Sequence, residues 1–350
     1  MTRMEFDPDG AALPDGGIYG LPSTSADARV ILIPVPWDAT TSYRRGTADG
    51  PAAILAASGQ IDLFDVETGT PYRAGIVMLD ESAEVLAWNT SGRALADPVI
   101  AAAGRFAGDA ALERAVAEVN ALSARVDGWV AAETERWLAA GRIVGVVGGD
   151  HSVPFGAIEV LARRHPGLGV LHVDAHADLR RAYEGFVGSH ASIMYNVVHR
   201  LPDVWRLVQV GIRDLAEAEH KVIRGAGSRI ATHFESALRS RLLGGGTWAA
   251  CCDAIVADLP ADVYVSFDID GLDPTLCPHT GTPVPGGLSF AEATYLLGAV
   301  VRSGRRIVGF DLTEVAPGPS GDEWDANVGM RLLYKLIGWT LVSQGLAPAV

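Results

Sequence analysis

The chain has 350 residues, of which 49% are hydrophobic and 20% are charged, and its formal net charge is −14. This composition favours one or two folded domains over disorder, and the acidity argues against nucleic-acid or anionic-membrane partners, because both require basic surfaces. The three cysteines have no C-x-x-C spacing, and no uninterrupted apolar stretch is long enough to span a membrane. We therefore expect a cytoplasmic protein without disulfides.

Strand and helix patterns alternate along the chain. Residues 1–28 form a Gly-, Pro- and Asp-rich arm, a β-branched run at 28–36 predicts the first strand, and an alanine-rich tract at 81–140 predicts helices that end at Gly141. A loop is expected at 37–51, further helices at 51–58, 154–167, 289–301 and 328–345, and further strands within 142–152, 168–179, 205–214, 262–274 and 306–317. This order predicts a single α/β domain over 29–350, with a mostly parallel sheet and helices on both faces.

Polar motifs follow four of the predicted strands. They are GGDHS at 148–152, DAHAD at 174–178, DIDGLDP at 268–274 and DLTEVAP at 311–317. The carboxyl ends of parallel strands meet at one edge of a sheet, where α/β proteins build their sites. We expect Asp174, His176 and Asp178 to share one face of an extended segment, because they alternate along it.

The side chains at this edge suit a pair of metal ions. The candidate ligands are two imidazoles and four carboxylates, namely His151, Asp174, His176, Asp178, Asp268 and Asp270. So many acids in a cleft repel one another unless cations lie between them, and mixed nitrogen and oxygen ligands suit Mn, Ni, Fe or Co better than Ca. Two such ions can hold a water and lower its pKa toward neutrality.

Each motif alone has a structural explanation, since Ser152 could cap a helix and Asp273–Pro274 is typical of a turn. All three metal-type motifs in order at strand ends favour a metal centre instead. His172, two residues before Asp174, fits either a partner of that centre or a core histidine.

These motifs, together with TGTPVPGG at 280–287, resemble those of the ureohydrolases, the family of arginases and agmatinases. The resemblance covers the chain from about residue 29 to its end. It implies a three-layer α/β/α fold and a metal-dependent hydrolase of linear amidines. It also implies that two divalent ions, Ni²⁺ or Mn²⁺, share Asp174 and Asp268 as bridging ligands.

The resemblance also implies roles for other residues. His190 is similar to a proton-shuttling histidine, Glu314 to a glutamate that binds the guanidinium, and Thr282 to a residue beside the guanidino group; Asp178 joins His190 and Glu314 as the candidate catalytic set. A carboxylate pairs well with a planar guanidinium, and histidine titrates in a useful range for proton transfer. The candidate pocket residues are Thr41, Tyr43, Tyr183, Met194 and Tyr195, although Met194 and Tyr195 also fit a helix core.

The loop WDATTSYRRG and the segments DLRRAYEGF and SHASIMYN look most like the guanidine hydrolase branch of the family. Guanidine, a methylguanidine or a biguanide such as metformin is then the expected substrate, and agmatine or guanidinobutyrate is the alternative. Two other classes stay open, a non-catalytic partner subunit of a mixed oligomer and a deacetylase of related fold. The resemblance implies a homotrimer or hexamer, with a homologous second subunit as a further option.

Overall fold

A parallel sheet of eight strands forms the centre of the computed structural model, which describes all residues except 1–5, 14–15, 320–321 and 348–350. The strand order is β2-β1-β3-β8-β7-β4-β5-β6, and every pair is parallel. The strands are β1 (Val30–Val35), β2 (Ile76–Met78), β3 (Ile143–Gly148), β4 (Leu168–Val173), β5 (Val204–Val210), β6 (Ile230–His233), β7 (Asp262–Asp268) and β8 (Arg306–Thr313). The central strands β1, β3 and β4 are buried along their whole length, as a sheet covered on both faces requires.

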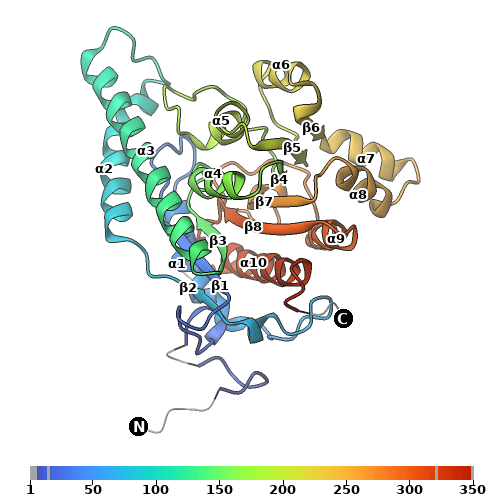
Figure 1. Ribbon diagram of the computed structural model, residues 1–350. Coiled ribbons are helices and arrows are strands. Elements are labelled where there is room, and N and C mark those ends of the chain that lie inside the picture. The colour runs from blue at the N-terminus through green and yellow to red at the C-terminus, as the bar shows by residue number, and fades with distance from the viewer. Residues whose placement is uncertain (1–5, 14–15, 320–321, 348–350) are drawn as a thin grey trace.

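Helices cover both faces of the sheet, which confirms the expected three-layer α/β/α class (Figure 1). They are α1 (Gly50–Ala57), α2 (Ala83–Ala101), α3 (Ala110–Ala139), α4 (Phe155–Arg164), α5 (Ile193–Arg200), α6 (Glu217–Gly225), α7 (Glu235–Leu243), α8 (Trp248–Ala257), α9 (Phe290–Arg302) and α10 (Trp324–Ser343). One apolar cluster joins the sheet to α1, α8, α9 and α10. Two others join the opposite face to α3, α4 and α5.

The long helices and the interior strands agree with the sequence expectations, and so do the shorter helices α1 and α4. The alanine-rich tract forms two antiparallel helices, α2 and α3, and Gly141 follows the second with a φ of +75°. Edge strands β2 and β6 and helices α6 to α8 were not predicted. The strands within 168–179, 262–274 and 306–317 end earlier than expected, at Val173, Asp268 and Thr313.

Part of the expected N-terminal arm packs on the domain itself. The Tyr19 ring is buried edge-on against Tyr334 of α10, and its hydroxyl donates to the Met330 carbonyl at 3.1 Å. Residues 1–5 and 14–15 of the arm lie outside the described residues.

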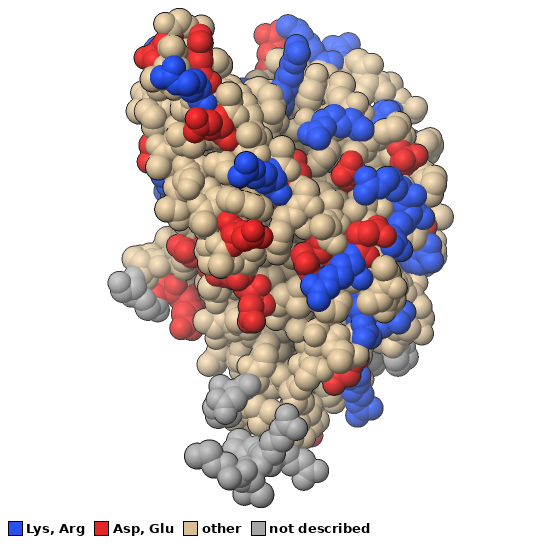
Figure 2. Space-filling model, turned by 60° about the vertical axis from the view of Figure 1, so that its left-hand side comes forward, with Lys and Arg blue, Asp and Glu red and all other residues tan. Residues whose placement is uncertain are grey.

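The outer surface carries charges of both signs. Figure 2 shows basic and acidic side chains intermingled over one face of the molecule. Within the described part of the chain, no helix combines the length and apolar character needed to cross a bilayer.

Candidate metal and active site

The four polar motifs meet at the carboxyl edge of four adjacent strands. In the sheet these strands lie in the order β3-β8-β7-β4, so GGDHS, DLTE, DID and DAHAD become neighbours. The turn after β3 needs Gly149, because a Cβ there would overlap the Trp37 carbonyl oxygen. The Asp150 amide donates to that oxygen at 2.8 Å, and this contact fixes the turn that presents His151.

The DAHAD segment is not extended as expected, since β4 ends at Val173 and the backbone of Asp178 turns to a φ of +52°. The backbone of His176 instead forms an isolated bridge with Asp214. A left-handed conformation costs a non-glycine residue about 1–3 kcal/mol and is typical of functional sites. The three side chains therefore reach the centre from an irregular turn and do not share one strand face.

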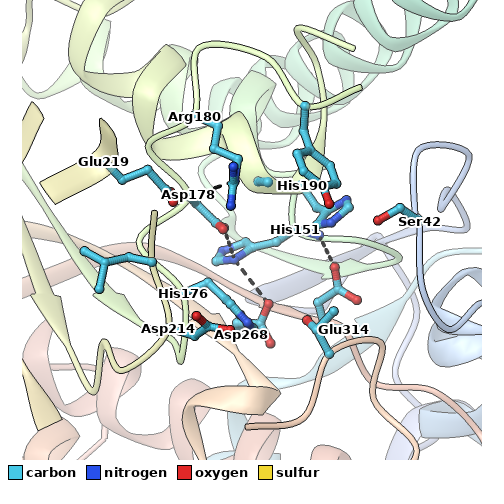
Figure 3. A pocket seen from close by; sticks show the side chains of 14 residues that line it. Ser42, His151, His176, Asp178, Arg180, His190, Asp214, Glu219, Asp268 and Glu314 are labelled. Carbon is cyan, nitrogen blue, oxygen red and sulfur yellow. Dashed lines mark hydrogen bonds and ion pairs between the residues drawn. The ribbon is translucent and has the colours of Figure 1, made fainter. Parts of the chain in front are cut away.

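Nδ1 of His151 lies within reach of three buried carboxylates. It is 3.0 Å from Asp174 Oδ2, 3.2 Å from Asp178 Oδ2 and 3.4 Å from Asp268 Oδ2. Figure 3 shows Asp178 and Asp268 gathered around this ring. Nε2 of the ring faces the Ser266 hydroxyl at 2.9 Å, so a proton on Nε2 leaves the Nδ1 lone pair directed at the carboxylates.

A second group of ligand atoms adjoins the first through Asp174. Nδ1 of His176 is 3.1 Å from Asp270 Oδ2 and 3.4 Å from Asp174 Oδ1. The first group of possible ligands contains His151, His172, Asp174 and Asp178, and the second contains Asp174, His176 and Asp270, so Asp174 belongs to both. Mixed nitrogen and carboxylate oxygen donors of this kind fit two divalent ions of the Mn or Ni type. All six candidate ligands of the sequence analysis thus lie together, and their roles remain predictions.

Burial and mutual repulsion make these acids hard to ionise together. Burial, with the Asp174 charge, raises the pKa of Asp178 to about 7. Burial and the charges of Asp270 and Asp174 raise the pKa of Asp268 well above its ordinary value. Cations between the carboxylates would remove both costs, because an opposite charge favours the ionised form.

Glu314 faces the same centre from the end of β8. Its Oε1 accepts the His151 backbone N–H at 2.9 Å, and its own backbone has a φ of +62° held by hydrogen bonds to Gly149 and Thr280. Burial and the Asp268 charge raise the pKa of this carboxyl well above its ordinary value. A cationic guanidinium bound here would favour the ionised form and pair with it.

His190 enters the pocket on a loop that α3 holds in place. Burial, with smaller contributions from His176 and His151, lowers the pKa of its ring to about 4, so the ring is neutral near pH 7. The loop turns tightly at Tyr183–Phe186, which exchange backbone hydrogen bonds of 3.1 and 2.8 Å.

Asn120 of α3 clamps this loop. Its amide nitrogen donates to the Gly185 carbonyl at 3.1 Å, and its amide oxygen accepts the Val187 N–H at 2.8 Å. Asn196 of α5 adds a third bond by donating to the Val187 carbonyl at 2.8 Å. These hydrogen bonds join residues far apart in the chain, so no local sequence pattern could predict them.

The cavity of about 180 Å³ above the cluster has a partly different lining from the one expected. Thr282 and Tyr183 line it as expected. Thr41, Tyr43, Met194 and Tyr195 are not among its lining residues: Thr41 and Met194 are buried, Tyr43 is 71% exposed, and Tyr195 stacks on His199. Pocket residues that the sequence analysis missed are Ser42, Arg180, Asp214, Leu215 and Glu219.

Three of these residues, Arg180, Asp214 and Glu219, bring charge to the pocket. Arg180 and Glu219 lie together at one side of the pocket, with 3.6 Å between Nε and Oε2 (Figure 3). The Arg180 guanidinium also stacks over the Tyr183 ring. Asp214 is exposed there and, among the described residues, has no ion-pair partner. Only its position after β5, at the shared edge of the sheet, could have suggested it.

A parallel α/β sheet with carboxylates and imidazoles clustered at its carboxyl edge is typical of hydrolases with a divalent-metal centre. A model of the arginase family matches residues 28–338, and the chain therefore belongs to that family. It is an amidinohydrolase, and this membership argues against the deacetylase alternative.

Relatives cover nearly the whole chain. The N(1)-aminopropylagmatine ureohydrolase of Thermus thermophilus is 33% identical over 313 residues, 89% of this chain and 90% of its own. The proclavaminate amidinohydrolase of Streptomyces clavuligerus is 31% identical and covers 87% of each chain. The solved agmatine ureohydrolase of Thermoplasma volcanium shares the fold, with a TM-score of 0.68, 21% identity and coverage of 96% of this chain and 95% of its own.

Proposed function

We propose that the protein hydrolyses a guanidino compound of the agmatine type, whose second end is an amine. Water adds to the guanidino carbon, the bond from that carbon to the substituted nitrogen breaks, and the products are urea and a protonated amine. The observation that carries the proposal is the exposed Asp214 carboxylate, which lines the pocket and has no ion-pair partner among the described residues, whereas Arg180 is paired with Glu219. The name of the Thermus thermophilus relative, an N(1)-aminopropylagmatine ureohydrolase, supports a substrate of this kind.

Residues of the chain itself have separate roles in the proposed reaction. Glu314 accepts hydrogen bonds from the guanidinium and holds its carbon above the carboxylate cluster. His190 is neutral and lines the same cavity, so it can take the proton that the attacking water loses and return it to the leaving nitrogen. Divalent ions bound by the six candidate ligands would supply Lewis acidity and activate water at neutral pH.

The end of the substrate away from the guanidino group lies beside Asp214, at the exposed side of the pocket. Arg180 is opposed by Glu219, which leaves the exposed carboxylate of Asp214 as the net charge of this group. An ammonium group is therefore favoured there over a carboxylate, which Asp214 would repel. Guanidinobutyrate and arginine, which end in carboxylates, are disfavoured.

Guanidine, methylguanidine or metformin is the second candidate, and one observation favours it. Arg180, stacked on Tyr183, places bulk and positive charge beside the route that a tail would follow. A substrate without a charged tail avoids that group and needs only the floor of the pocket.

One panel of substrates separates these candidates. The protein is loaded separately with Mn²⁺ and Ni²⁺, and urea and ammonia are measured with agmatine, N(1)-aminopropylagmatine, guanidinobutyrate, arginine, guanidine, methylguanidine and metformin. Agmatine and guanidinobutyrate form a matched pair, since the ammonium of one replaces the carboxylate of the other. We expect agmatine to have the higher kcat/KM of the two. Preference for guanidinobutyrate would contradict the proposal, and turnover of the tail-free compounds alone would favour the second candidate.

The Asp214→Asn variant tests the tail contact directly. We expect KM for agmatine to rise about fivefold, since an exposed charge pair contributes roughly 1 kcal/mol. KM for guanidine should not change, and Asp253→Asn, an exposed acid on α8, is the matched control.

We also propose that the chain assembles into a homotrimer or hexamer, with a mixed oligomer that contains a homologous second subunit as the alternative. Mass measurement in solution tests the assembly. Full activity of the purified chain alone would argue against a required partner.

A further inference from the structure

A row of polar residues crosses the sheet directly beneath the carboxylate cluster. In register, Asp311 of β8 pairs with Ser266 of β7, Ser266 with His172 of β4, His172 with Gln209 of β5, and Gln209 with Thr232 of β6. All of them are buried except Thr232, which is half-buried. The interior of a parallel sheet is normally apolar, so five polar residues in one row require an explanation.

The row marks the point where an apolar core ends. The residues two positions earlier on four of these strands are Val170, Leu207, Ile230 and Tyr264, and all four belong to the apolar cluster beneath α4 and α5. Side chains two apart on a strand share a face, so the row forms the polar layer between that core and the site. His172, Gln209 and Thr232 have no part in the proposed reaction.

The hydrogen bonds along this layer have one direction. The Gln209 side-chain nitrogen lies 2.8 Å from the Ala177 carbonyl, which can only accept, so this atom is the amide NH₂ group. The same nitrogen lies 3.0 Å from His172 Nδ1, which therefore accepts. The Gln209 oxygen in turn accepts from the Thr232 hydroxyl at 2.9 Å.

The hydrogen bond at the other end of the polar layer indicates the same direction of donation. His172 Nε2 lies 2.8 Å from Asp174 Oδ2, and a carboxylate can only accept, so the ring carries its proton on Nε2. Donation runs from Thr232 through Gln209 and His172 to Asp174.

This chain of bonds orients the carboxylate that both groups of ligand atoms share. Oδ2 of Asp174 accepts from His172, and Oδ1 accepts from the His176 backbone N–H at 2.6 Å. A carboxylate has about four lone-pair positions, so each oxygen keeps one directed at the cluster. Without His172, Asp174 would lose the hydrogen bond that orients its Oδ2 and would keep only the bond from the His176 N–H to Oδ1.

We propose that His172, oriented by Gln209, is a positioning residue that holds the Asp174 carboxylate ready to bridge two divalent ions. The inference rests on the metal centre assumed in the proposed function but not on the identity of the substrate. Partners of metal ligands of this kind commonly change metal affinity 10- to 100-fold when they are replaced.

Binding of Mn²⁺ to the metal-free full-length protein, followed by the electron paramagnetic resonance signal of free Mn²⁺, tests this role without any substrate. His172→Met fills the ring's space without a donor, whereas His172→Gln keeps an N–H near the position of Nε2. We expect the Met variant to bind Mn²⁺ roughly 10- to 100-fold more weakly and the Gln variant to recover most of that loss. A fold-stabilising role alone would make no such distinction.

Gln209→Glu tests the direction of the bonds in a side chain of nearly the same shape. A carboxylate at this position would draw a proton to His172 Nδ1, so that Nε2 either loses its proton or belongs to a cationic ring beside Asp174. Both outcomes weaken cation binding, and we expect about a tenfold loss of Mn²⁺ affinity. Thr340→Val, which removes a buried hydroxyl bonded only within α10, is the control.

Circular dichroism of the metal-free variants identifies any that fail to fold. In that case the near-isosteric variants His172→Gln and Gln209→Glu still test the inference. Equal Mn²⁺ affinity of the Met and Gln variants, or wild-type affinity in Gln209→Glu, would overturn the inference. A protein that binds two Mn²⁺ ions but hydrolyses no guanidino compound of the substrate panel would contradict the proposed function and leave this inference intact.

Discussion

Replacing Asn120 by alanine should slow catalysis although Asn120 lies on α3, outside the pocket lining. The change removes two hydrogen bonds to the backbone of the loop that carries Arg180, Tyr183 and His190 into the cavity. At about 1 kcal/mol each, the two bonds contribute about 2 kcal/mol, which corresponds to roughly a 30-fold change in the ratio of ordered to displaced loop. We expect kcat/KM to fall by up to this factor.

A graded series makes the test quantitative. Asn196→Ala removes one bond to the same loop, so it should lose about 1 kcal/mol, or roughly fivefold in kcat/KM. Asn327→Ala in α10 removes a bond to Arg331, remote from the loop, and is the matched control. Steady-state kinetics are combined with elemental analysis, because bound metal should be the same in all three variants. Activity of Asn120→Ala within twofold of the control would refute the reasoning.

Three further predictions concern binding, pH and packing. Glu314→Gln should lower kcat/KM about 100-fold, since a charge-assisted hydrogen bond contributes up to about 3 kcal/mol, and elemental analysis should show unchanged metal content. Burial raises the pKa of Asp127 to about 7, so this carboxyl holds its proton more tightly in the folded state than in the unfolded chain. The free energy of unfolding should therefore decrease as the pH rises from about 4 to about 7. Asp127→Asn should remove this loss of stability, and urea denaturation at pH 5 and pH 8 measures the free energy of unfolding. If the substitution changed that free energy equally at both pH values, burial of the Asp127 carboxyl would not be the explanation. Gly149→Ala should destabilise the fold by about 3 kcal/mol through its clash with the Trp37 carbonyl, and a melting temperature equal to that of the wild type would contradict this.

The chain sequence alone predicted much of the architecture. Buried strands and long amphipathic helices have local patterns of apolar residues, so β1, β3, β4, α3 and α10 were expected near their observed positions. The short edge strands β2 and β6 contain three and four residues, too few for a pattern to emerge above chance.

The candidate ligands were predictable for a similar reason. Polar motifs directly after apolar runs mark strand ends, and parallel strands bring those ends to one edge. The backbone path between the ligands was not predictable, because the left-handed turn at Asp178 depends on contacts made by later segments such as Asp214. For the same reason Ser42, and not its neighbours Thr41 and Tyr43, reaches the cavity.

The partners of the site were decided by tertiary structure alone. The sequence determined, through local apolar periodicity, that the helix around residue 120 and the strand around residue 209 would form. It did not determine that Asn120 would meet the loop at 185–187, or that Gln209 would orient His172. Those contacts depend on strand order and register, which arise from packing between segments far apart in the chain.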